Sequence, residues 1–186
     1  MGKIVVTEWM SLDGVFDAKA MSVWFNPYHS DGRAAAITAL ITSSSALLLG
    51  RVTYEMLAPY WSGQTTDEMG PASKLNGMPK YVVSSTLKQA RWANTAGFIS
   101  GDVEGEVARL RHQVDGDILI AGSAMLTHSL IAAGLVDEFV FLVHPIIMGS
   151  GARFFAEEAQ TTELELVAAD VVGRGVTLLR YQPAIG

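Results

Sequence analysis

Apolar and polar positions follow two different periods along the chain, and the change of period separates predicted strands from predicted helices. Short runs of β-branched or continuous apolar residues predict strands over residues 4–10, 46–49, 80–84, 97–100 and 117–121. Apolar residues that recur at helical spacing predict helices over residues 32–44, 52–58, 103–114 and 123–133. After residue 136 the character becomes β, with strands predicted over residues 139–143, 163–172 and 176–181.

Residues at the ends of these segments predict where helices begin and end. Asp31 and Asp102 are suitable N-caps for the helices that follow them. Gly134 suits the position just after a helix, where a left-handed conformation is common. Pro59 is expected to end its helix, because proline has no N–H to donate and its ring crowds the preceding turn. Two irregular segments are expected to be loops, residues 15–30 and 62–76.

The order of the elements predicts an α/β fold. Strands that alternate with helices form a parallel sheet covered on both faces. The last two strands, joined by Gly173-Arg174-Gly175, predict an antiparallel hairpin at one edge of that sheet. We therefore expect one domain, residues 1–186, with three α/β/α layers and a mixed, mostly parallel central sheet. Ligands of such sheets bind at the carboxyl ends of the strands.

Composition and charge exclude several classes of protein. The chain has 13 Lys+Arg against 19 Asp+Glu, and this net charge of −6 argues against nucleic-acid binding. The absence of cysteine excludes disulfide scaffolds and Cys-ligated zinc, and it fits a cytoplasmic location. The most apolar window, residues 118–136, is broken by polar residues and glycines, so we expect no membrane span. No metal site is expected from the scattered histidines, which are His29, His112, His128 and His144.

Two predicted helix starts are candidate anion sites. The first consists of Gly50, Arg51 and Thr53, and the second of Gly122, Ser123, Ala124 and Met125. A glycine at a strand end lets a ligand approach the backbone, and the helix N-terminus supplies N–H groups and partial positive charge. Arg51 adds a fork of donors for phosphate. Each segment is also consistent with an ordinary tight turn, but two of them in an acidic chain favour a ligand with several phosphates.

Polar residues follow two other predicted strands. Asp13, in Ser11-Leu12-Asp13-Gly14, is either a proton-handling carboxylate at the mouth of the sheet or the acceptor of a common turn. Ser84 and Ser85 either bind a phosphate or ribose or cap a turn. Several aromatic residues near these ends pack at the edge of the core or form a wall for a flat ring; they are Trp24, Phe25, Tyr28, Tyr60 and Trp61.

Taken together, these segments follow one another in the order of a known family. They are Ser11-Leu12-Asp13-Gly14, Gly50-Arg51-x-Thr53-Tyr54-Glu55, Val83-Ser84-Ser85 and a block from Gly122-Ser123 through Gly134-Leu135-Val136-Asp137-Glu138, His144-Pro145 and Gly149-Ser150-Gly151 to Phe154. Over about residues 3–182 the chain resembles the dihydrofolate reductase-like superfamily. Within it, the chain is most similar to stand-alone proteins that resemble the C-terminal reductase domain of the bifunctional riboflavin biosynthesis protein.

The resemblance implies an α/β/α reductase that uses NADPH and forms a homodimer. It places Gly50, Arg51 and Thr53 at the phosphates of the cofactor, and Ser84 and Ser85 near its 2′-phosphate. It places Gly122, Ser123, Ala124 and Met125 along the pyrophosphate and nicotinamide. Asp13 matches the acidic residue of the riboflavin reductase motif, and Asp31 lies near the carboxylate that binds the pterin in dihydrofolate reductases. Because the chain has no cysteine, the resemblance extends to the reductase step and not to the zinc-dependent deaminase step.

The expected function is therefore hydride transfer from NADPH to a flat nitrogen heterocycle, such as a pterin, an aminopyrimidine or a flavin precursor. Asp13 is the first candidate for handling the proton and Asp31 the second. NADPH is expected rather than NADH because Arg51 and the two serines offer partners for an additional phosphate. The alternative is a dimeric, non-catalytic paralogue that binds a nucleotide.

Overall fold

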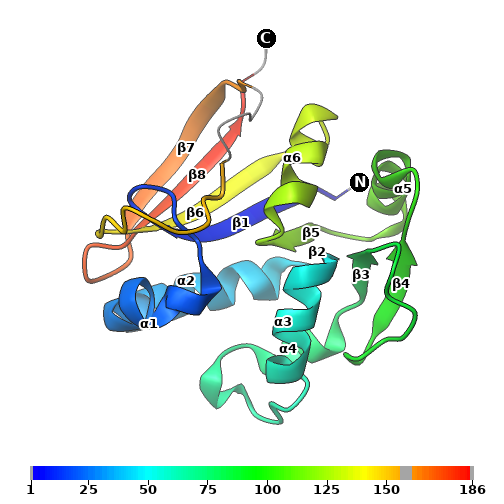
Figure 1. Ribbon diagram of the computed structural model, residues 1–186, viewed down its shortest axis with the longest axis horizontal. Coiled ribbons are helices and arrows are strands. Elements are labelled where there is room, and N and C mark those ends of the chain that lie inside the picture. Colours follow the sequence, from blue (N-terminus) through cyan, green and yellow to red (C-terminus); the bar gives the residue numbers. More distant parts are fainter. Residues whose placement is uncertain (1, 156–160, 185–186) are drawn as a thin grey trace.

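The computed structural model describes residues 2–155 and 161–184, and within these ranges the strands form one sheet (Figure 1). Its spatial order is β4-β3-β2-β5-β1-β6-β8-β7. The strands are β1 (Ile4–Ser11), β2 (Ala46–Gly50), β3 (Lys80–Val83), β4 (Thr95–Ile99), β5 (Ile118–Ala121), β6 (Glu138–His144), β7 (Leu164–Val171) and β8 (Thr177–Pro183). The first six are parallel, and β8 runs antiparallel to both β6 and β7. The mixed, mostly parallel sheet with a terminal hairpin is confirmed.

Helices cover both faces of this sheet. The longer helices are α2 (Asp31–Ser43), α3 (Arg51–Trp61), α4 (Ala72–Gly77), α5 (Val103–Gln113) and α6 (Ala124–Ala132). Alternate residues of β1 belong to two separate cores: Ile4 and Val6 pack with α5 and α6, whereas Val5 packs with α2, α3 and α4. This division is the three-layer arrangement. None of the helices in the described ranges has the length and apolar character needed to cross a bilayer.

Two of the expected helix ends are confirmed and one cap is corrected. The Asp102 carboxylate accepts the Gly105 N–H at the start of α5, and Gly134 has φ +66° just after α6. Asp31 does not cap α2. Ser30 is the cap: its Oγ accepts the Arg33 N–H at 3.2 Å and donates to the Val172 carbonyl. Asp31 instead occupies the first helical position, where an acidic side chain favours the helix dipole.

The prediction that Pro59 ends its helix is wrong. α3 continues to Trp61, with Pro59 inside its last turn. A proline so near the end removes a single helical hydrogen bond, and the continuation packs Trp61 against the core.

The two segments expected to be loops contain short helices. They are η1 (Ala18–Ala20), α1 (Met21–Trp24), η2 (Asn26–Tyr28) and η3 (Asp67–Met69), together with α4. Burial and a local hydrogen bond fix these turns: Trp24 is buried, and its indole N–H donates to the Asp17 carbonyl. On α4, Ala72 and Leu75 are buried in the same way.

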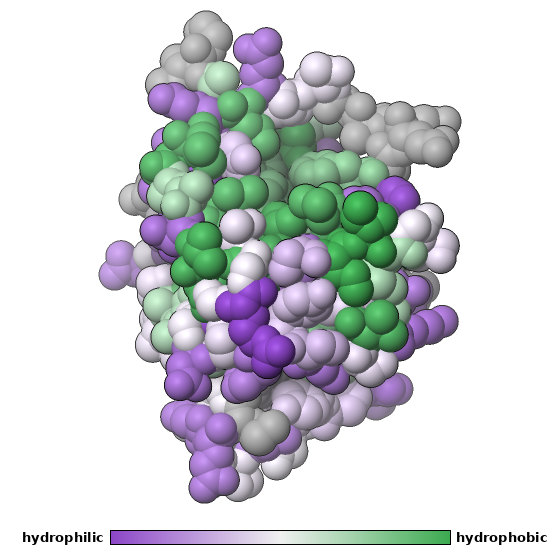
Figure 2. Space-filling model, turned by 90° about the vertical axis from the view of Figure 1, so that its left-hand side faces the viewer, coloured by the Kyte–Doolittle hydropathy of each residue, from purple (hydrophilic) through white to green (hydrophobic). Residues whose placement is uncertain are grey.

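The outermost strand, β7, has little cover. It pairs with β8 on one side and forms the edge of the sheet on the other. Leu166, Val167 and Val171 are exposed on β7. Figure 2 views the molecule from the left-hand side of Figure 1, where β7 lies, and shows apolar groups at the surface of that side.

Candidate active site

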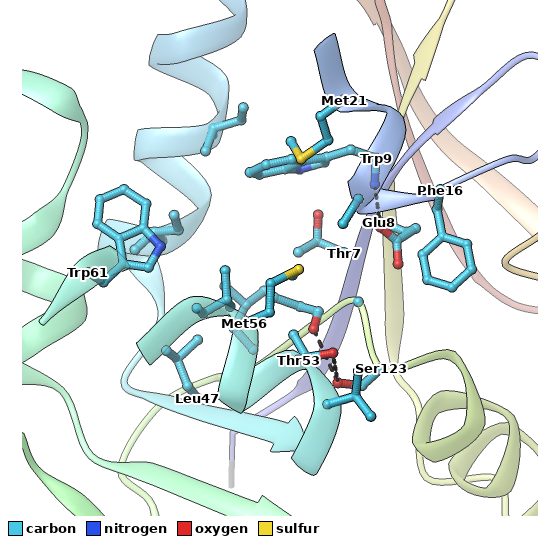
Figure 3. Close-up of a pocket in the computed structure, with 18 of the residues that line it drawn as sticks. Thr7, Glu8, Trp9, Phe16, Met21, Leu47, Thr53, Met56, Trp61 and Ser123 are labelled. Atoms are coloured by element: carbon cyan, nitrogen blue, oxygen red, sulfur yellow. Dashed lines mark hydrogen bonds between the residues drawn. The ribbon is translucent and has the colours of Figure 1, made fainter. Parts of the chain in front are cut away.

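A cavity of about 290 Å³ lies where β1 and β5 approach their carboxyl ends, under α2 and α3 (Figure 3). β1 supplies Thr7, Glu8 and Trp9 to its wall, and the chain after β5 supplies Gly122 and Ser123. The helices contribute mainly aliphatic and sulfur-containing side chains. Among the described residues that line it, none is a lysine, an arginine or a histidine. The cavity therefore suits a largely apolar ligand about as large as an aromatic ring system.

Hydrogen bonds join the two helix starts that border this cavity. The Ser123 Oγ accepts the Gly50 N–H at 2.9 Å and donates to Thr53 Oγ1 at 3.0 Å. β2 and β5 are neighbours in the sheet, so α3 and α6 begin side by side at the same edge. The first N–H groups of each helix have no acceptor within the helix itself, and both dipoles place partial positive charge here. This pair of helix starts can hold a bridging anion such as a pyrophosphate.

The backbone at the start of α6 is strained. Gly122 has φ +61°, and Ser123 follows with φ +59°, a left-handed conformation that costs an ordinary residue roughly 1–2 kcal/mol. The Ser123 side chain compensates through its bonds to Gly50 and Thr53. A Cβ at Gly122 would lie 3.6 Å from both Glu8 Oε2 and Thr53 Oγ1. Glycine therefore lets a ligand approach the backbone at this point more closely than a residue with a side chain would.

Glu8 is a buried carboxyl group in this wall. Its side chain is only 8% exposed; Oε1 accepts the Trp9 N–H at 2.9 Å, whereas Oε2 has no hydrogen-bond partner. Burial raises the pKa of Glu8 to about 8, and the Trp9 N–H bond opposes that rise only in part. Near neutral pH the group is therefore mostly protonated, and it can act as a hydrogen-bond or proton donor.

Aromatic rings form the opposite side of the cavity. Trp9 stacks on Phe25 with ring centroids 4.9 Å apart, and Met21 lies against Trp9 (Figure 3). Trp61, at the end of α3, and Trp24 also line the cavity. The expectation that Trp24 and Trp61 contribute to a wall fits this placement, and such a wall suits a flat ring.

A buried polar cluster fixes this aromatic wall. Arg33, 3% exposed, donates to the Phe25 carbonyl at 2.6 Å and lies 3.9 Å above the Phe25 ring centroid. Its guanidinium is also 3.2 Å from His144 Nε2, while His144 Nδ1 lies 3.1 Å from the Met10 carbonyl. Burial and the nearby Arg33 lower the pKa of His144, although its bond to Met10 opposes this. The imidazole therefore stays neutral, donates from Nδ1 and accepts from Arg33.

The residues that the sequence assigns to the cofactor are only partly brought together. Gly50, Thr53, Gly122 and Ser123 form the linked helix starts. Arg51 begins α3 beside them, and its guanidinium pairs with Glu55 at the surface. Ala124 and Met125 begin α6, with the Met125 side chain in solvent. Ser84 and Ser85 follow β3, the strand next to β2, and the Ser84 hydroxyl accepts the Thr86 and Leu87 N–H groups.

Asp13 lies outside the cavity wall. Its carboxylate accepts hydrogen bonds from the Ser11 hydroxyl and from the Met148 and Gly149 N–H groups, and it pairs with Arg153. The Ser11 bond and those from Met148 and Gly149 lower the pKa of Asp13 to about 2. It is thus a carboxylate at neutral pH with no proton to donate, and it ties the turn after β1 to the loop after β6.

Asp31 does not line the cavity either; it lies at the exposed start of α2. The inner side of α2 reaches the cavity through Ile37, Leu40 and Ile41 instead. The sequence analysis did not single out Glu8, although a signal for it exists. A glutamate in the middle of the apolar run Ile4–Met10 is either exposed to solvent or buried, and burial of a carboxyl group is costly unless a partner satisfies it.

Comparison with known proteins agrees with this geometry. The Bacillus subtilis protein YyaP, which is uncharacterized, is 28% identical over 181 residues that cover 96% of this chain and 94% of YyaP. A putative riboflavin biosynthesis protein from Shewanella sp. PV-4 superimposes with a TM-score of 0.74 at 20% identity, and each chain is fully covered. A dihydrofolate reductase from Enterococcus faecalis, in complex with NADP(H), superimposes with a TM-score of 0.66 at 17% identity and covers 99% and 98% of the two chains.

The fold is therefore that of the dihydrofolate reductase-like α/β proteins. The model of the RibD C-terminal domain family matches residues 2–178, so this chain belongs to that family. Its similarity to RibD-like and dihydrofolate reductase-like proteins places it among the folds and families of reductases.

Proposed function

We propose that the protein is an NADPH-dependent reductase that acts on a flat heterocyclic substrate of the riboflavin or folate type. One observation carries the proposal: two helix N-termini, linked through Ser123, border an apolar cavity with a buried carboxyl group. A dinucleotide needs an anion site beside a pocket for a flat ring, and this edge of the sheet offers both. The Enterococcus faecalis reductase that shares the fold binds NADP(H).

The residues at this edge fit the proposed cofactor. Gly50, Arg51, Thr53 and Ser123 would hold the phosphates, and the absence of a side chain at Gly122 would let the cofactor approach the backbone at the start of α6. When bound, the reduced nicotinamide supplies a hydride. The chain itself binds and orients the acceptor between the helix starts and the aromatic wall, and that wall excludes water. Glu8 is the titratable group placed to hold a proton beside the acceptor.

Arg51→Ala tests the proposal through binding. NADPH titrated into the protein should change tryptophan fluorescence, because Trp9, Trp24 and Trp61 line the cavity. Loss of one charged hydrogen bond to phosphate costs about 1.5–3 kcal/mol, so Arg51→Ala should bind NADPH roughly 10- to 150-fold more weakly. NADH, which lacks the additional phosphate, should bind more weakly to the wild type.

Arg109→Ala is the matched control. Arg109 is also exposed and also pairs with a glutamate of its own helix, Glu106, but it lies on α5, away from the cavity. This variant should bind NADPH as the wild type does. No binding at millimolar NADPH would refute the reductase assignment. Binding without oxidation across pterins, pyrimidines and flavins would favour a non-catalytic nucleotide-binding protein.

A further inference from the structure

The cavity contains a hydrogen-bonding group that the fold leaves unused. Glu8 belongs to the middle of β1, where neighbouring residues Ile4, Val6 and Met10 on the same face form apolar core. Its register partner on β6 is Phe141, and Phe16 lies beside its carboxyl group in Figure 3. No ion pair accompanies this carboxyl group in the described chain, and Oε2 has no partner of any kind. A buried polar group of this kind is costly unless something satisfies it.

The two carboxyl oxygens have different surroundings. Oε1 already accepts the Trp9 N–H, so a proton on the neutral group belongs on Oε2. Oε2 lies next to Gly122, a residue that lines the cavity: a Cβ at Gly122 would stand 3.6 Å from both Oε2 and Thr53 Oγ1. The neutral group thus presents one O–H donor toward the part of the cavity that borders the start of α6.

The rest of the wall restricts the charge of a ligand. The described lining residues include no cationic side chain, and Asp17 is the other acidic residue among them. The Asp17 carboxylate caps η1 by accepting the Lys19 N–H. An anionic substituent buried here would have no counter-ion, whereas Trp9, Phe16, Met21 and Trp61 offer surfaces for an uncharged ring.

From this arrangement we infer that Glu8 donates its Oε2–H to a carbonyl oxygen or ring nitrogen of an uncharged, flat bicyclic ligand that carries no phosphate. The inference rests on the proposed function insofar as this ligand is the hydride acceptor, but it concerns binding and can be measured without a cofactor. It deepens the proposal by defining the substrate class of the cavity. A pKa near 8 for Glu8 supports it, because the group then keeps its proton at neutral pH.

Three bicyclic probes of similar size separate the contributions. The probes are 2-quinolone, which is neutral and carries a carbonyl group, naphthalene, which lacks an acceptor, and 1-naphthyl phosphate, which is anionic. Titrated at pH 7 without cofactor, in the presence of excess pyrophosphate to occupy the anion site at the two helix starts, and followed by tryptophan fluorescence, 2-quinolone should bind more tightly than both others. Its affinity should fall about tenfold between pH 7 and pH 9 as Glu8 ionises, whereas the affinity for naphthalene should not change.

Two substitutions at Glu8 assign the effect. In Glu8→Gln the side-chain carbonyl can still accept the Trp9 N–H and the amide N–H₂ replaces the donor, so 2-quinolone should bind within about threefold of the wild type but without pH dependence. Glu8→Met has similar volume and no donor, so it should bind 2-quinolone at least tenfold more weakly while binding naphthalene normally. Normal naphthalene binding shows that the cavity of the variant is intact.

Several outcomes would overturn the inference. These are no binding of 2-quinolone at its solubility limit, equal binding of 1-naphthyl phosphate, or an unchanged pH profile in Glu8→Gln. Tighter binding of cationic 4-aminoquinoline than of 2-quinolone would show that Glu8 binds ligands as a carboxylate instead. The two proposals can fail separately: NADPH binding without 2-quinolone binding removes this inference alone, and the reverse result removes the cofactor assignment alone.

Discussion

Glu8 should make the protein less stable as the pH rises. In the unfolded chain its carboxyl group has the ordinary pKa of 4.5, whereas in the folded protein burial raises it to about 8. Between these values the unfolded state has released a proton that the folded state still holds. With each increase in pH the free energy of the unfolded state therefore falls relative to that of the folded state, and the folded protein becomes less stable. The contribution of Glu8 to stability is fully present below pH 4.5 and is lost as the pH approaches 8.

The magnitude follows from the difference between the two pKa values. Each pKa unit corresponds to about 1.4 kcal/mol, so between pH 5 and pH 8 this one group should lower the free energy of unfolding by about 3–4 kcal/mol. Glu8→Gln does not titrate and should lack this component. Absolute stabilities are less informative, because the new amide introduces its own unpaired N–H groups.

Urea denaturation of both proteins at several values between pH 5 and pH 8 measures the effect, provided that the m-value is unchanged. The stability of the wild type relative to Glu8→Gln should fall steadily across this range. Glu165→Gln, a substitution at an exposed strand position on β7, should retain the pH dependence of the wild type. Parallel pH profiles for wild type and Glu8→Gln would show that Glu8 is not a buried neutral acid.

Three further substitutions test other parts of the structure. Lys80 is fully buried and donates to the carbonyls of Asn76, Met78 and Ala93; Lys80→Met leaves these acceptors unpaired and should lower the urea-derived stability by about 3 kcal/mol or more. Asp13→Asn should lower the melting temperature but leave NADPH and 2-quinolone binding unchanged, and a loss of binding measured by fluorescence would return Asp13 to the active site. Ser123→Ala removes the bonds to Gly50 and Thr53, so it should lower stability by about 1–2 kcal/mol and weaken NADPH binding. Ser123→Gly loses the same bonds but relieves the strain of the left-handed backbone, so it should melt at a higher temperature than Ser123→Ala.

The sequence predicted the two helix starts separately but not their contact. Glycine at a strand end followed by a helix is a local pattern, and Gly50 and Gly122 both show it. Their proximity depends on β2 and β5 being neighbours in the sheet, and the order of strands is not encoded in any short segment. The bond from Gly50 to Ser123 joins residues 73 positions apart.

The prediction of the proton-handling group had a different weakness. Asp13 belongs to a recognisable motif. A motif identifies the type of residue, but it does not predict which groups surround that side chain in the folded protein. Besides the Ser11 hydroxyl, the donors to the Asp13 carboxylate include the Met148 and Gly149 N–H groups of the loop after β6, more than a hundred residues away. Glu8 belongs to no motif. It becomes a candidate because its carboxyl group is buried and Oε2 has no hydrogen-bond partner, and both properties depend on the packing of the whole fold.

The edge strand β7 has a consequence for the behaviour of the protein in concentrated solution. A strand with one unpaired side offers N–H and C=O groups to which a strand of another molecule can add, and the exposed Leu166, Val167 and Val171 would make such an addition favourable. Glu165 and Asp170 are exposed on the same strand, and their like charges oppose the approach of an identical edge. The repulsion between these two carboxylates therefore opposes self-association through this edge, and salt screens that repulsion at high ionic strength.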